Sequence, residues 1–391
     1  MSHVAMVLPG LDRIGGAEQQ ALLLAAGLCR RGWRVSVVAL SGSGGRAAEH
    51  LRETGIAFQS LEMRKGLADP RGWLRLNKWL CREQPDVAHA HLAHAALMTR
   101  WSRLAAPVPA VIDTLHSSRT GKPLRRLGYA MSRWLPDHVT AVSQAAADSH
   151  LAAGMVEPGS LSVLSNGIDV GHWRPDAAAR AAKRKELGLD GDFLWLAVGR
   201  LEPVKDYPTL LRAMTRLPQA ARLVVLGAGP LESELRSMAA ALGLSGRVRF
   251  AGFDANVPGW MRAADGLVLS SRWEGLPMAL LEAGACEVPA VATSAAGTSE
   301  AMVHGETGWL APVADPEGLA AAMSRLMGLP IDERRHMGIR ARQHATKNFS
   351  IADVLDRWEQ LYTELLERKA NARRTRPTAR EILRRPSADT A

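Results

Sequence analysis

The sequence FLWLAVGRLEPVKD, residues 193–206, sets the pattern for the second half of the chain. An apolar run from Phe193 to Val198 ends at Gly199, and two cations, Arg200 and Lys205, follow it. Apolar runs of similar length recur at residues 222–226, 248–251, 266–269 and 290–293, with helical sequence between most of them. Because strands that alternate with helices form a parallel sheet covered on both faces, this half predicts a doubly wound α/β domain.

The first half of the chain shows the same alternation. An apolar run at residues 3–8 ends in Pro9 and Gly10, and a helical segment at residues 17–31 closes at Gly32. At 391 residues, the chain also exceeds what one hydrophobic core usually supports. We therefore predict two doubly wound, Rossmann-like α/β domains that face each other across a cleft. The further strands predicted in this half are residues 34–40, 87–90, 110–114, 138–142 and 161–164.

Changes in composition mark the boundaries between these parts. The stretch after Asn166 is polar and broken by Pro175, which is typical of a passage between domains. Near the end, apolar residues such as Val354 and Trp358 recur at core-facing helical spacing and predict a helix that packs back across both domains. The predicted parts are a first domain at 1–170, a linker at 171–190, a second domain at 191–348, the helix at 349–369 and a disordered basic tail at 370–391.

The formal net charge of +10 is concentrated in two places, which argues against nucleic acid as a partner. Residues 368–391 hold eight Lys or Arg against two acids, a net charge of +6. A second cluster at residues 119–134 has apolar residues at helical spacing, so it predicts an amphipathic helix with a cationic face. Such a helix either lies on an anionic membrane surface or packs its apolar stripe on its own domain. The cluster consists of Arg119, Lys122, Arg125, Arg126 and Arg133 with Leu124, Leu127, Met131 and Trp134.

The sequence also predicts the compartment. No apolar stretch approaches the roughly 18 residues needed to cross a bilayer, and the start, MSHVAMVLPG, lacks the features of a signal peptide. Cys29, Cys81 and Cys286 are too scattered for a disulfide framework or a zinc site. We expect a cytoplasmic protein with peripheral contact to the inner face of the plasma membrane.

Motifs after the strands of the second half carry the candidate chemistry. Arg200 and Lys205 suit a diphosphate, because Arg chelates phosphate oxygens and Lys supplies a mobile charge, although isolated surface cations look the same. The segments LVVLGAGP (223–230) and ATSAAGTSEAMVHGETGWL (292–310) supply glycines that let a ligand or a neighbouring loop approach the backbone. Each of these three motifs is weak evidence on its own.

The segment SSRWEGLPMALLEAGA, residues 270–285, is the most specific of the motifs. Gly275 breaks the strand and Pro277 suits the first turn of a helix that contains Glu282. Along a regular helix, Glu274 and Glu282 would lie about 12 Å apart near one face. The acid and base of a glycosidase lie about 5–9.5 Å apart, so we expect these carboxylates to hold two ends of an elongated ligand. Backbone N–H groups at the start of the helix would favour a phosphate there.

Taken in order, the motifs VGRLEPVKDYPTLLRA, LGAGP, EGLPMALLEA and GTSEAMVHGETGWL resemble the signature of the retaining GT-B glycosyltransferases of family 4. In the first half, LDRIGGAEQ, VIDTLHSS, AVSQ and SNGIDVGHWRP are similar to further segments of that family, so the resemblance covers about residues 3–345. The chain departs from the family pattern at Asp206, where Gly is frequent, and at Ala296, where a double glycine is common.

The resemblance implies a nucleotide diphosphate sugar as donor and no metal or other cofactor. Arg200 and Lys205 would bind the diphosphate, Glu274 the hydroxyls of the transferred sugar, and Glu282 the ribose. His116 would lie beside the reacting sugar. The implied catalytic residues are His116, Glu274, Arg200 and Lys205, the implied donor-binding residues are Gly16, Arg200, Lys205, Glu274, Gly275, Leu276 and Glu282, and Asn166 lies near the hinge.

Several alternatives remain open at this point. The acceptor is either a lipid-linked glycan of bacterial cell-surface polysaccharide synthesis or a soluble small molecule. A nicotinamide-dependent oxidoreductase shares the alternation, but residues 9–18 lack the G-x-G-x-x-G spacing. A non-catalytic sugar-nucleotide binder would not need Glu274 or His116. The histidines His89, His91 and His94 are more typical of a structural role than of a metal site, because no Cys or carboxylate stands nearby.

Overall fold

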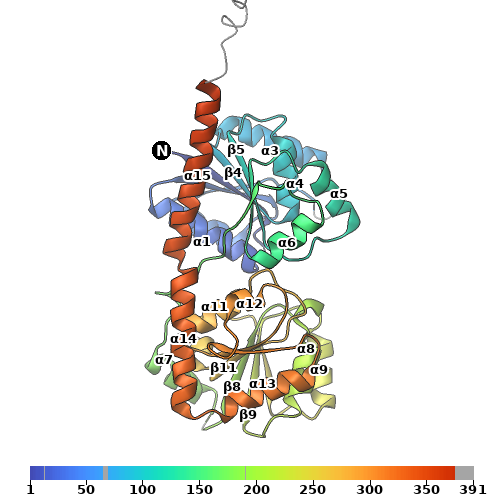
Figure 1. Ribbon diagram of the computed structural model, residues 1–391, viewed down its shortest axis with the longest axis vertical. Helices are drawn as coiled ribbons and strands as arrows, with labels where there is room; N and C mark the ends of the chain where they lie inside the picture. Colours follow the sequence, from blue (N-terminus) through green and yellow to red (C-terminus); the bar gives the residue numbers. More distant parts are fainter. Residues whose placement is uncertain (13, 65–68, 190, 375–391) are drawn as a thin grey trace, which may run out of the picture.

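The structure is a computed structural model that describes residues 1–12, 14–64, 69–189 and 191–374. Two domains lie end to end, each built on one parallel sheet with helices around it (Figure 1). The strand order is β3-β2-β1-β4-β5-β6-β7 in the first sheet and β10-β9-β8-β11-β12-β13 in the second, and all neighbours are parallel. The predicted fold class, two doubly wound α/β domains, is confirmed.

The strands agree closely with the sequence pattern. The first sheet consists of β1 (His3–Gly10), β2 (Arg34–Ser41), β3 (Ala57–Ser60), β4 (Val87–His91), β5 (Ala110–Leu115), β6 (His138–Ala141) and β7 (Leu161–Val163). The second consists of β8 (Phe193–Val198), β9 (Ala221–Leu226), β10 (Val248–Gly252), β11 (Gly266–Leu269), β12 (Ala290–Thr293) and β13 (Gly308–Ala311). Only β3 and β13, which lie at the edges of their sheets, were not expected from the sequence.

Each sheet is buried on both faces. Along β8, Leu194 and Leu196 pack into one apolar cluster, whereas Trp195 and Ala197 pack into another. Successive side chains of a strand point to opposite faces of the sheet, so this division places one core on each side. Strands that are apolar throughout are typical of such doubly covered parallel sheets.

Helices cover both faces of the first sheet. The side chain of Asp69 caps α3 by accepting hydrogen bonds from the N–H groups of Arg71 and Gly72 at 3.1 and 3.2 Å. Ser143 caps α6 in the same way through the N–H of Ala146 at 3.2 Å. The helices of this domain are α1 (Gly16–Arg30), α2 (Gly45–Glu53), α3 (Pro70–Glu83), α4 (Ala93–Ser102), α5 (Pro123–Met131) and α6 (Gln144–Ala152).

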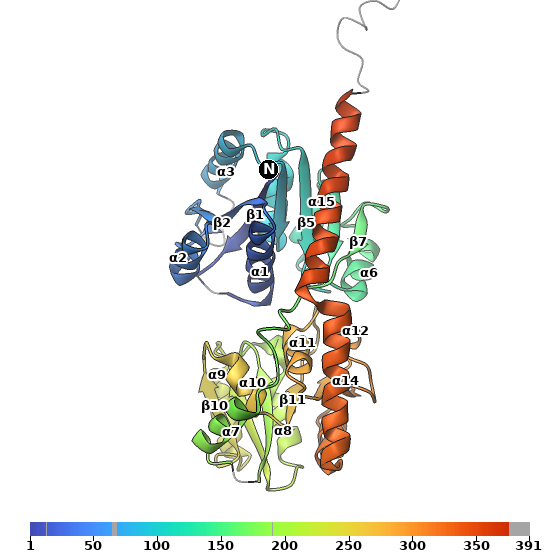
Figure 2. The same ribbon diagram turned by 90° about the vertical axis from the view of Figure 1, so that its left-hand side faces the viewer.

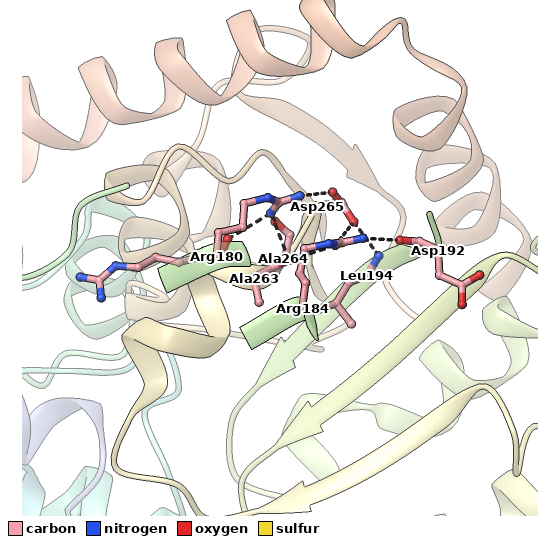
Figure 3. A network of polar contacts seen from close by, with 8 residues as sticks. Arg180, Arg184, Asp192, Leu194, Ala263, Ala264 and Asp265 are labelled. Atoms are coloured by element: carbon pink, nitrogen blue, oxygen red, sulfur yellow. Dashed lines mark hydrogen bonds and ion pairs between the residues drawn. The ribbon is translucent and has the colours of Figure 1, made fainter. Parts of the chain in front are cut away.

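The stretch 171–190, predicted as the linker, contains a helix that packs on the second domain. This helix, α7 (Ala177–Glu186), contacts α10 (Val257–Ala263). Figure 3 shows Arg180 and Arg184 reaching the carboxylate of Asp265, and Arg184 donates to it at 2.8 Å. The same carboxylate accepts from the N–H of Leu194 in β8, so α7 is fixed to the sheet. The other helices of this domain are η1 (Pro203–Lys205), α8 (Tyr207–Met214), α9 (Glu232–Ala241), α11 (Met278–Ala285), α12 (Thr298–Ala301) and α13 (Pro316–Gly328).

The last two helices connect the domains. The helix α14 (Ile331–Phe349) packs on α11, and α15 (Ile351–Arg374) then runs along the first domain beside α1 (Figures 1 and 2). At the crossing, the N–H of Ile168 donates to the carbonyl of Phe349 at 2.7 Å, and the N–H of Ile351 donates to the carbonyl of Ile168 at 2.9 Å. Both passages of the chain between the domains therefore meet at one point.

The prediction of disorder from residue 370 onward is wrong for its first part. Residues 370–374 continue α15, because alanine and charged residues extend a helix that tertiary packing has already started. The rest of the predicted tail, residues 375–391, lies outside the described residues.

Candidate active site

A cleft of about 1290 Å³ lies between the two domains at the carboxyl ends of their strands. The first domain lines it with residues 14–19 at the start of α1, with residues 44–47 at the start of α2, and with His116 and Asn166. The second domain contributes the loops after β8, β9, β10 and β11. Of the residues with implied roles, the cleft brings together Gly16, His116, Asn166, Arg200, Lys205, Glu274, Gly275, Leu276 and Glu282.

The charged centre of the second domain is an ion pair between Lys205 and Glu274. Lys205 ends η1, just beyond β8, and Glu274 lies in the loop after β11. The Lys205 Nζ lies 2.6 Å from Glu274 Oε1, which also accepts a hydrogen bond from Ser271 Oγ at 2.6 Å. The two side chains remain 20% and 13% exposed. The pair is thus held in place while both groups keep access to the cleft.

Arg200 is placed more openly than Lys205. Its side chain is 62% exposed and forms an ion pair with Glu202. Because an exposed ion pair contributes little stability, Arg200 can exchange this partner for an anion at small cost. Both predicted cations therefore line the cleft: Lys205 is held by its ion pair with Glu274, and Arg200 is exposed.

Glu282 occupies an unusual environment for a carboxylate. It lies inside α11 and is only 7% exposed. Burial raises the pKa of Glu282 to about 7, against the lowering effect of the Lys205 charge. The expectation that Glu274 and Glu282 share one regular helix is wrong, because α11 begins only at Met278 and Glu274 precedes it. The separation of about 12 Å along a helix therefore does not apply.

Gly275 brings the two domains into direct contact. A Cβ at this position would lie 2.1 Å from the carbonyl oxygen of His116, so no other residue fits. Leu276, the next residue, is 6% exposed and packs its side chain into the core of the second domain. At the opposite wall, Gly16 begins α1, and a Cβ there would lie 3.7 Å from Met278 of α11. The two domains therefore come close together at Gly275 and at Gly16.

His116 follows β5 and faces the cleft from the first domain. Burial lowers its pKa to about 4, so the ring is neutral near pH 7. Its Nε2 atom lies 3.0 Å from Nδ1 of His91, the last residue of β4. His89, two residues earlier, forms hydrogen bonds with Tyr362 and Thr114. Within the described ranges, no group of three or more His, Cys, Asp or Glu side chains is placed to hold a metal ion.

Of the two departures from the family pattern, Asp206 has a local explanation. Asp206 has a φ of +46°, in the left-handed region that favours Gly, and Asp is one of the few other residues that visit it. Its carboxylate accepts hydrogen bonds from Thr209 at 2.9 Å and Arg272 at 3.1 Å. At the second departure, the carbonyl of Ala296 accepts from the N–H of Glu274 at 3.2 Å. The next residue, Gly297, has a φ of +81°, and a Cβ there would lie 1.9 Å from the carbonyl oxygen of Gly275, so glycine is required there.

Several contacts across the domains were not predicted from the sequence. Ser118 Oγ donates to the backbone carbonyl of Glu274 at 2.8 Å. The guanidinium of Arg119 lies 4.2 Å from the ring centroid of Trp273, so assigning Arg119 to a free cationic helix face was wrong. Sequence spacing gives no signal for such pairs, because their members are far apart in the chain.

Glu300 forms another contact between the domains. Its carboxylate accepts from the first N–H groups of α6, those of Gln144 and Ala145, at 2.7 and 3.0 Å. A negative charge is favourable at a helix amino terminus, so Glu300 joins the domains beside the cleft.

Comparison with known proteins identifies the family of the chain. The family model of Glycosyltransferase Family 4 matches residues 14–172, and that of Glycosyl transferases group 1 matches residues 179–344. The chain is 25% identical, over 78% of its length and 81% of the relative's, to UDP-Gal:alpha-D-GlcNAc-diphosphoundecaprenol alpha-1,3-galactosyltransferase of Escherichia coli. It is 30% identical to D-inositol 3-phosphate glycosyltransferase of Thermobispora bispora, over 74% of its own length and 68% of the relative's.

Among solved structures, Anabaena HepE in complex with UDP has the same fold, with a TM-score of 0.82 at 21% identity. The match covers 93% of this chain and 100% of that one. The chain therefore belongs to the family 4, group 1 glycosyltransferases, and it is a GT-B enzyme that uses nucleotide sugars. The predicted family and enzyme class are confirmed, and the oxidoreductase alternative is excluded. Over the part of the chain that the structure describes, no helix is both long and apolar enough to span a membrane.

Proposed function

We propose that the enzyme transfers a sugar, with retention of anomeric configuration, from a nucleotide diphosphate sugar to a lipid-linked glycan in bacterial cell-surface polysaccharide synthesis. The observation that carries this proposal is the cleft in which Lys205 and Glu274 of the second domain lie opposite His116 of the first. The name of the E. coli relative specifies a diphosphoundecaprenol-linked acceptor. Another relative, 28% identical, is a mannosyltransferase of Mycobacterium tuberculosis that acts on phosphatidylinositol monomannoside.

In the proposed complex, the donor lies along the second domain. Its diphosphate contacts Arg200 and Lys205, and the hydroxyls of its sugar contact Glu274. Glu282 accepts from the ribose hydroxyls, and N–H groups near Gly16 approach the phosphates from the first domain. HepE, which has the same fold, has been solved with UDP-glucose, and this supports a nucleotide sugar as the donor. We propose that no divalent ion takes part, because cationic side chains occupy the position where the leaving charge develops.

The proposed reaction breaks the bond between the anomeric carbon and the diphosphate oxygen, whose electron pair leaves with the diphosphate. A hydroxyl oxygen of the acceptor bonds to the same carbon, and its proton passes to the departing diphosphate oxygen. Lys205 and Arg200 stabilise the negative charge that grows on the leaving group. Because His116 is neutral, it does not repel the positive charge that develops on the sugar.

The surface of α5 supports a location on an anionic membrane at the cytoplasmic face. The apolar side chains of this segment are exposed on the first domain, which supports the membrane interpretation. The buried residue of α5 is Tyr129, whose ring lies 4.5 Å from the buried guanidinium of Arg100. The exposed fractions are 80% for Leu124, 54% for Leu127, 59% for Met131 and 63% for Trp134.

Charge on the same segment favours anionic lipid. Lys122, Arg125 and Arg126 are exposed beside the apolar residues, whereas Arg133 forms an ion pair with Glu157 at 2.8 Å. Exposed apolar side chains together with cations are the features of a helix that lies in a membrane interface. A lipid-linked acceptor would then reach the cleft from the same surface.

Product analysis tests the proposed reaction. The enzyme is incubated with a panel of nucleotide sugars and with either a diphosphoundecaprenol-linked glycan or a water-soluble sugar acceptor, and the products are identified by mass spectrometry. We expect one sugar to be added to the lipid-linked glycan, with the anomeric configuration of the donor as read by NMR. Transfer only to the soluble acceptor, or an inverted product, would contradict the proposal.

A further inference from the structure

Segments of both domains meet at the loop that bears Glu274. On the second domain, the N–H of Glu274 donates to the carbonyl of Ala296 at 3.2 Å. From the first domain, Ser118 Oγ donates to the carbonyl of Glu274 at 2.8 Å, and the guanidinium of Arg119 lies over the ring of Trp273. We propose that Ser118 and Arg119 are positioning residues, which hold Glu274 in place from across the cleft. This inference rests on the proposed function, in which Glu274 contacts the donor sugar.

The first domain fixes the backbone of this loop. Within the described ranges, only Ser118 donates a hydrogen bond to the carbonyl of Glu274. The next residue, Gly275, lies directly against the backbone of the first domain. A Cβ there would lie 2.1 Å from the carbonyl oxygen of His116 and 3.2 Å from the Cα of Ser117. The peptide group that joins Glu274 to Gly275 is therefore held from the first domain.

Arg119 contacts the tryptophan of the same loop. Its guanidinium carbon lies 4.2 Å from the ring centroid of Trp273, within the distance of about 6 Å at which a cation is attracted to the face of a ring. The N–H of Arg119 donates to Ser117 Oγ at 3.1 Å, which fixes the turn that presents the side chain. Just before Trp273, the N–H of Arg272 donates to the carbonyl of Val204 at 2.8 Å, within the second domain. The contact with Arg119 therefore begins directly after this internal attachment.

The carboxylate of Glu274 is held by its own domain, through Lys205 and Ser271 at 2.6 Å each. Its position also depends on the backbone that Ser118 and Arg119 hold. A nucleoside diphosphate lacks the transferred sugar, so its binding does not need the position of Glu274. Loss of the contacts across the cleft should therefore slow transfer of the sugar and leave binding of a nucleoside diphosphate unchanged.

Fluorine NMR of the full chain tests the contact without a substrate. The protein is labelled with 5-fluorotryptophan, and Trp273→Phe identifies one signal among those of the 11 tryptophans. We expect Arg119→Ala to shift the signal of Trp273, because it removes the cation from the face of the ring. The matched control is Arg325→Ala, which removes an exposed arginine 4.9 Å from the ring centroid of Trp309 within the second domain. It should leave the signal of Trp273 in place.

A Trp273 signal that Arg119→Ala does not shift would overturn the inference, because the two domains would then not touch at this point in solution. Since no substrate is added, the outcome does not depend on whether the proposed donor and acceptor are correct.

Kinetics test the positioning role with the donor and acceptor that the unaltered enzyme uses. We expect kcat to fall about 2–5-fold in Arg119→Ala, through loss of an exposed cation–π contact, and about 2–10-fold in Ser118→Ala, through loss of one hydrogen bond. Ser118→Thr keeps the hydroxyl and should keep most of kcat. Calorimetric titration with UDP or GDP should give the same Kd for all of these variants. Unchanged kcat in both alanine variants, or a Kd that weakens as much as kcat falls, would overturn the proposal.

A double-mutant cycle separates positioning from direct contact with the substrate. If Arg119 acts through Trp273, Arg119→Ala should lower kcat in the unaltered enzyme but not in Trp273→Leu, where the ring is already missing. An equal fall in both backgrounds would mean that Arg119 contacts the substrate itself and would overturn the inference. Transfer only to a soluble acceptor would contradict the proposed function and leave this comparison valid. If Trp273→Leu does not fold, the fluorine signal still decides the contact.

Discussion

The two domains contribute different kinds of side chain to the centre of the cleft. The second domain offers charge, with Lys205 and Glu274 paired at 2.6 Å and Arg200 exposed beside them. The first domain offers His116, whose ring is neutral and belongs to an interior row of uncharged rings. A charged wall suits a diphosphate, and the neutral ring of His116 suits a sugar on which positive charge develops, whereas the charged residues of the first domain that line the cleft, Asp12, Glu18 and Arg46, belong to other segments. In the proposed reaction, this division would place the leaving group on the second domain and the reacting carbon between the two domains.

The largest effect is expected from removing the charged wall. Lys205→Ala and Glu274→Ala should each lower the transfer rate by about 10² or more, the loss seen when one preorganised donor is removed. Lys347→Ala and Glu333→Ala, two exposed residues of α14 that do not line the cleft, are the matched controls. Normal turnover by both cleft variants, with circular dichroism unchanged, would mean that the charged wall lies elsewhere.

The sequence predicted this charged wall because its members are local to strand ends. Arg200 and Lys205 follow β8 directly, and Glu274 lies five residues after β11 ends at Leu269. The row of histidines could not be predicted in this way. His91 and His116 lie 25 residues apart, and His89 and Tyr362 lie 273 apart, so only the assembled fold brings them together.

The strands also differ in how well their own sequence predicts them. The central strands β8, β11 and β12, which are apolar except for Thr293 at the end of β12, were predicted with their observed bounds. The edge strands β3 and β13 have four residues each, and β3, AFQS, contains only two apolar ones. Such strands form because a neighbouring strand offers hydrogen bonds, which is not visible in their own sequence.

The next largest effect concerns the outer surface of the first domain. Each basic residue near an anionic membrane contributes about 1 kcal/mol, so Arg125→Glu with Arg126→Glu should weaken binding to anionic vesicles by about 30-fold. Binding should also weaken steeply with salt, because the Debye length is only about 8 Å at physiological ionic strength. Removal of residues 375–391, which carry four Arg and two acids, should add a smaller loss.

Co-sedimentation with vesicles measures this effect. The matched control is Arg335→Glu with Lys347→Glu, two exposed residues of α14 in the second domain. Equal binding of both double variants to anionic and neutral vesicles would show that α5 does not dock on lipid.

Glu282 should make the stability of the protein depend on pH in an unusual direction. Its pKa is raised from 4.5 to about 7 by burial, so the native state keeps a proton that the unfolded state releases. The contribution of Glu282 to stability should therefore fall as pH rises from about 4.5 to about 7. Glu282→Gln removes this fall, so between pH 5 and pH 8 the stability of the variant should rise by about 2–3 kcal/mol relative to that of the unaltered protein.

Urea denaturation at the two pH values measures the difference, and Glu49→Gln, an exposed acid on α2, is the control. If the two variants respond identically to pH, Glu282 is ionised in the native protein throughout this range.

The last prediction is that removal of divalent ions does not change the transfer rate. If cationic side chains replace a divalent ion, EDTA should leave the transfer rate unchanged. The assay compares rates before and after chelation, followed by addition of magnesium or manganese. Activity lost with EDTA and regained with either ion would show that the charged wall needs a metal to complete it.

Hydrogen–deuterium exchange with a nucleoside diphosphate tests most directly whether the second domain holds the donor. UDP and GDP are added in turn to the full chain, and backbone protection is compared with that of the free protein. We expect one of them to protect residues 199–206 and 270–282 strongly, with a smaller effect at residues 14–19, since most of the implied donor contacts belong to the second domain. Protection confined to the first domain, or unchanged in Lys205→Ala, would contradict this division of roles.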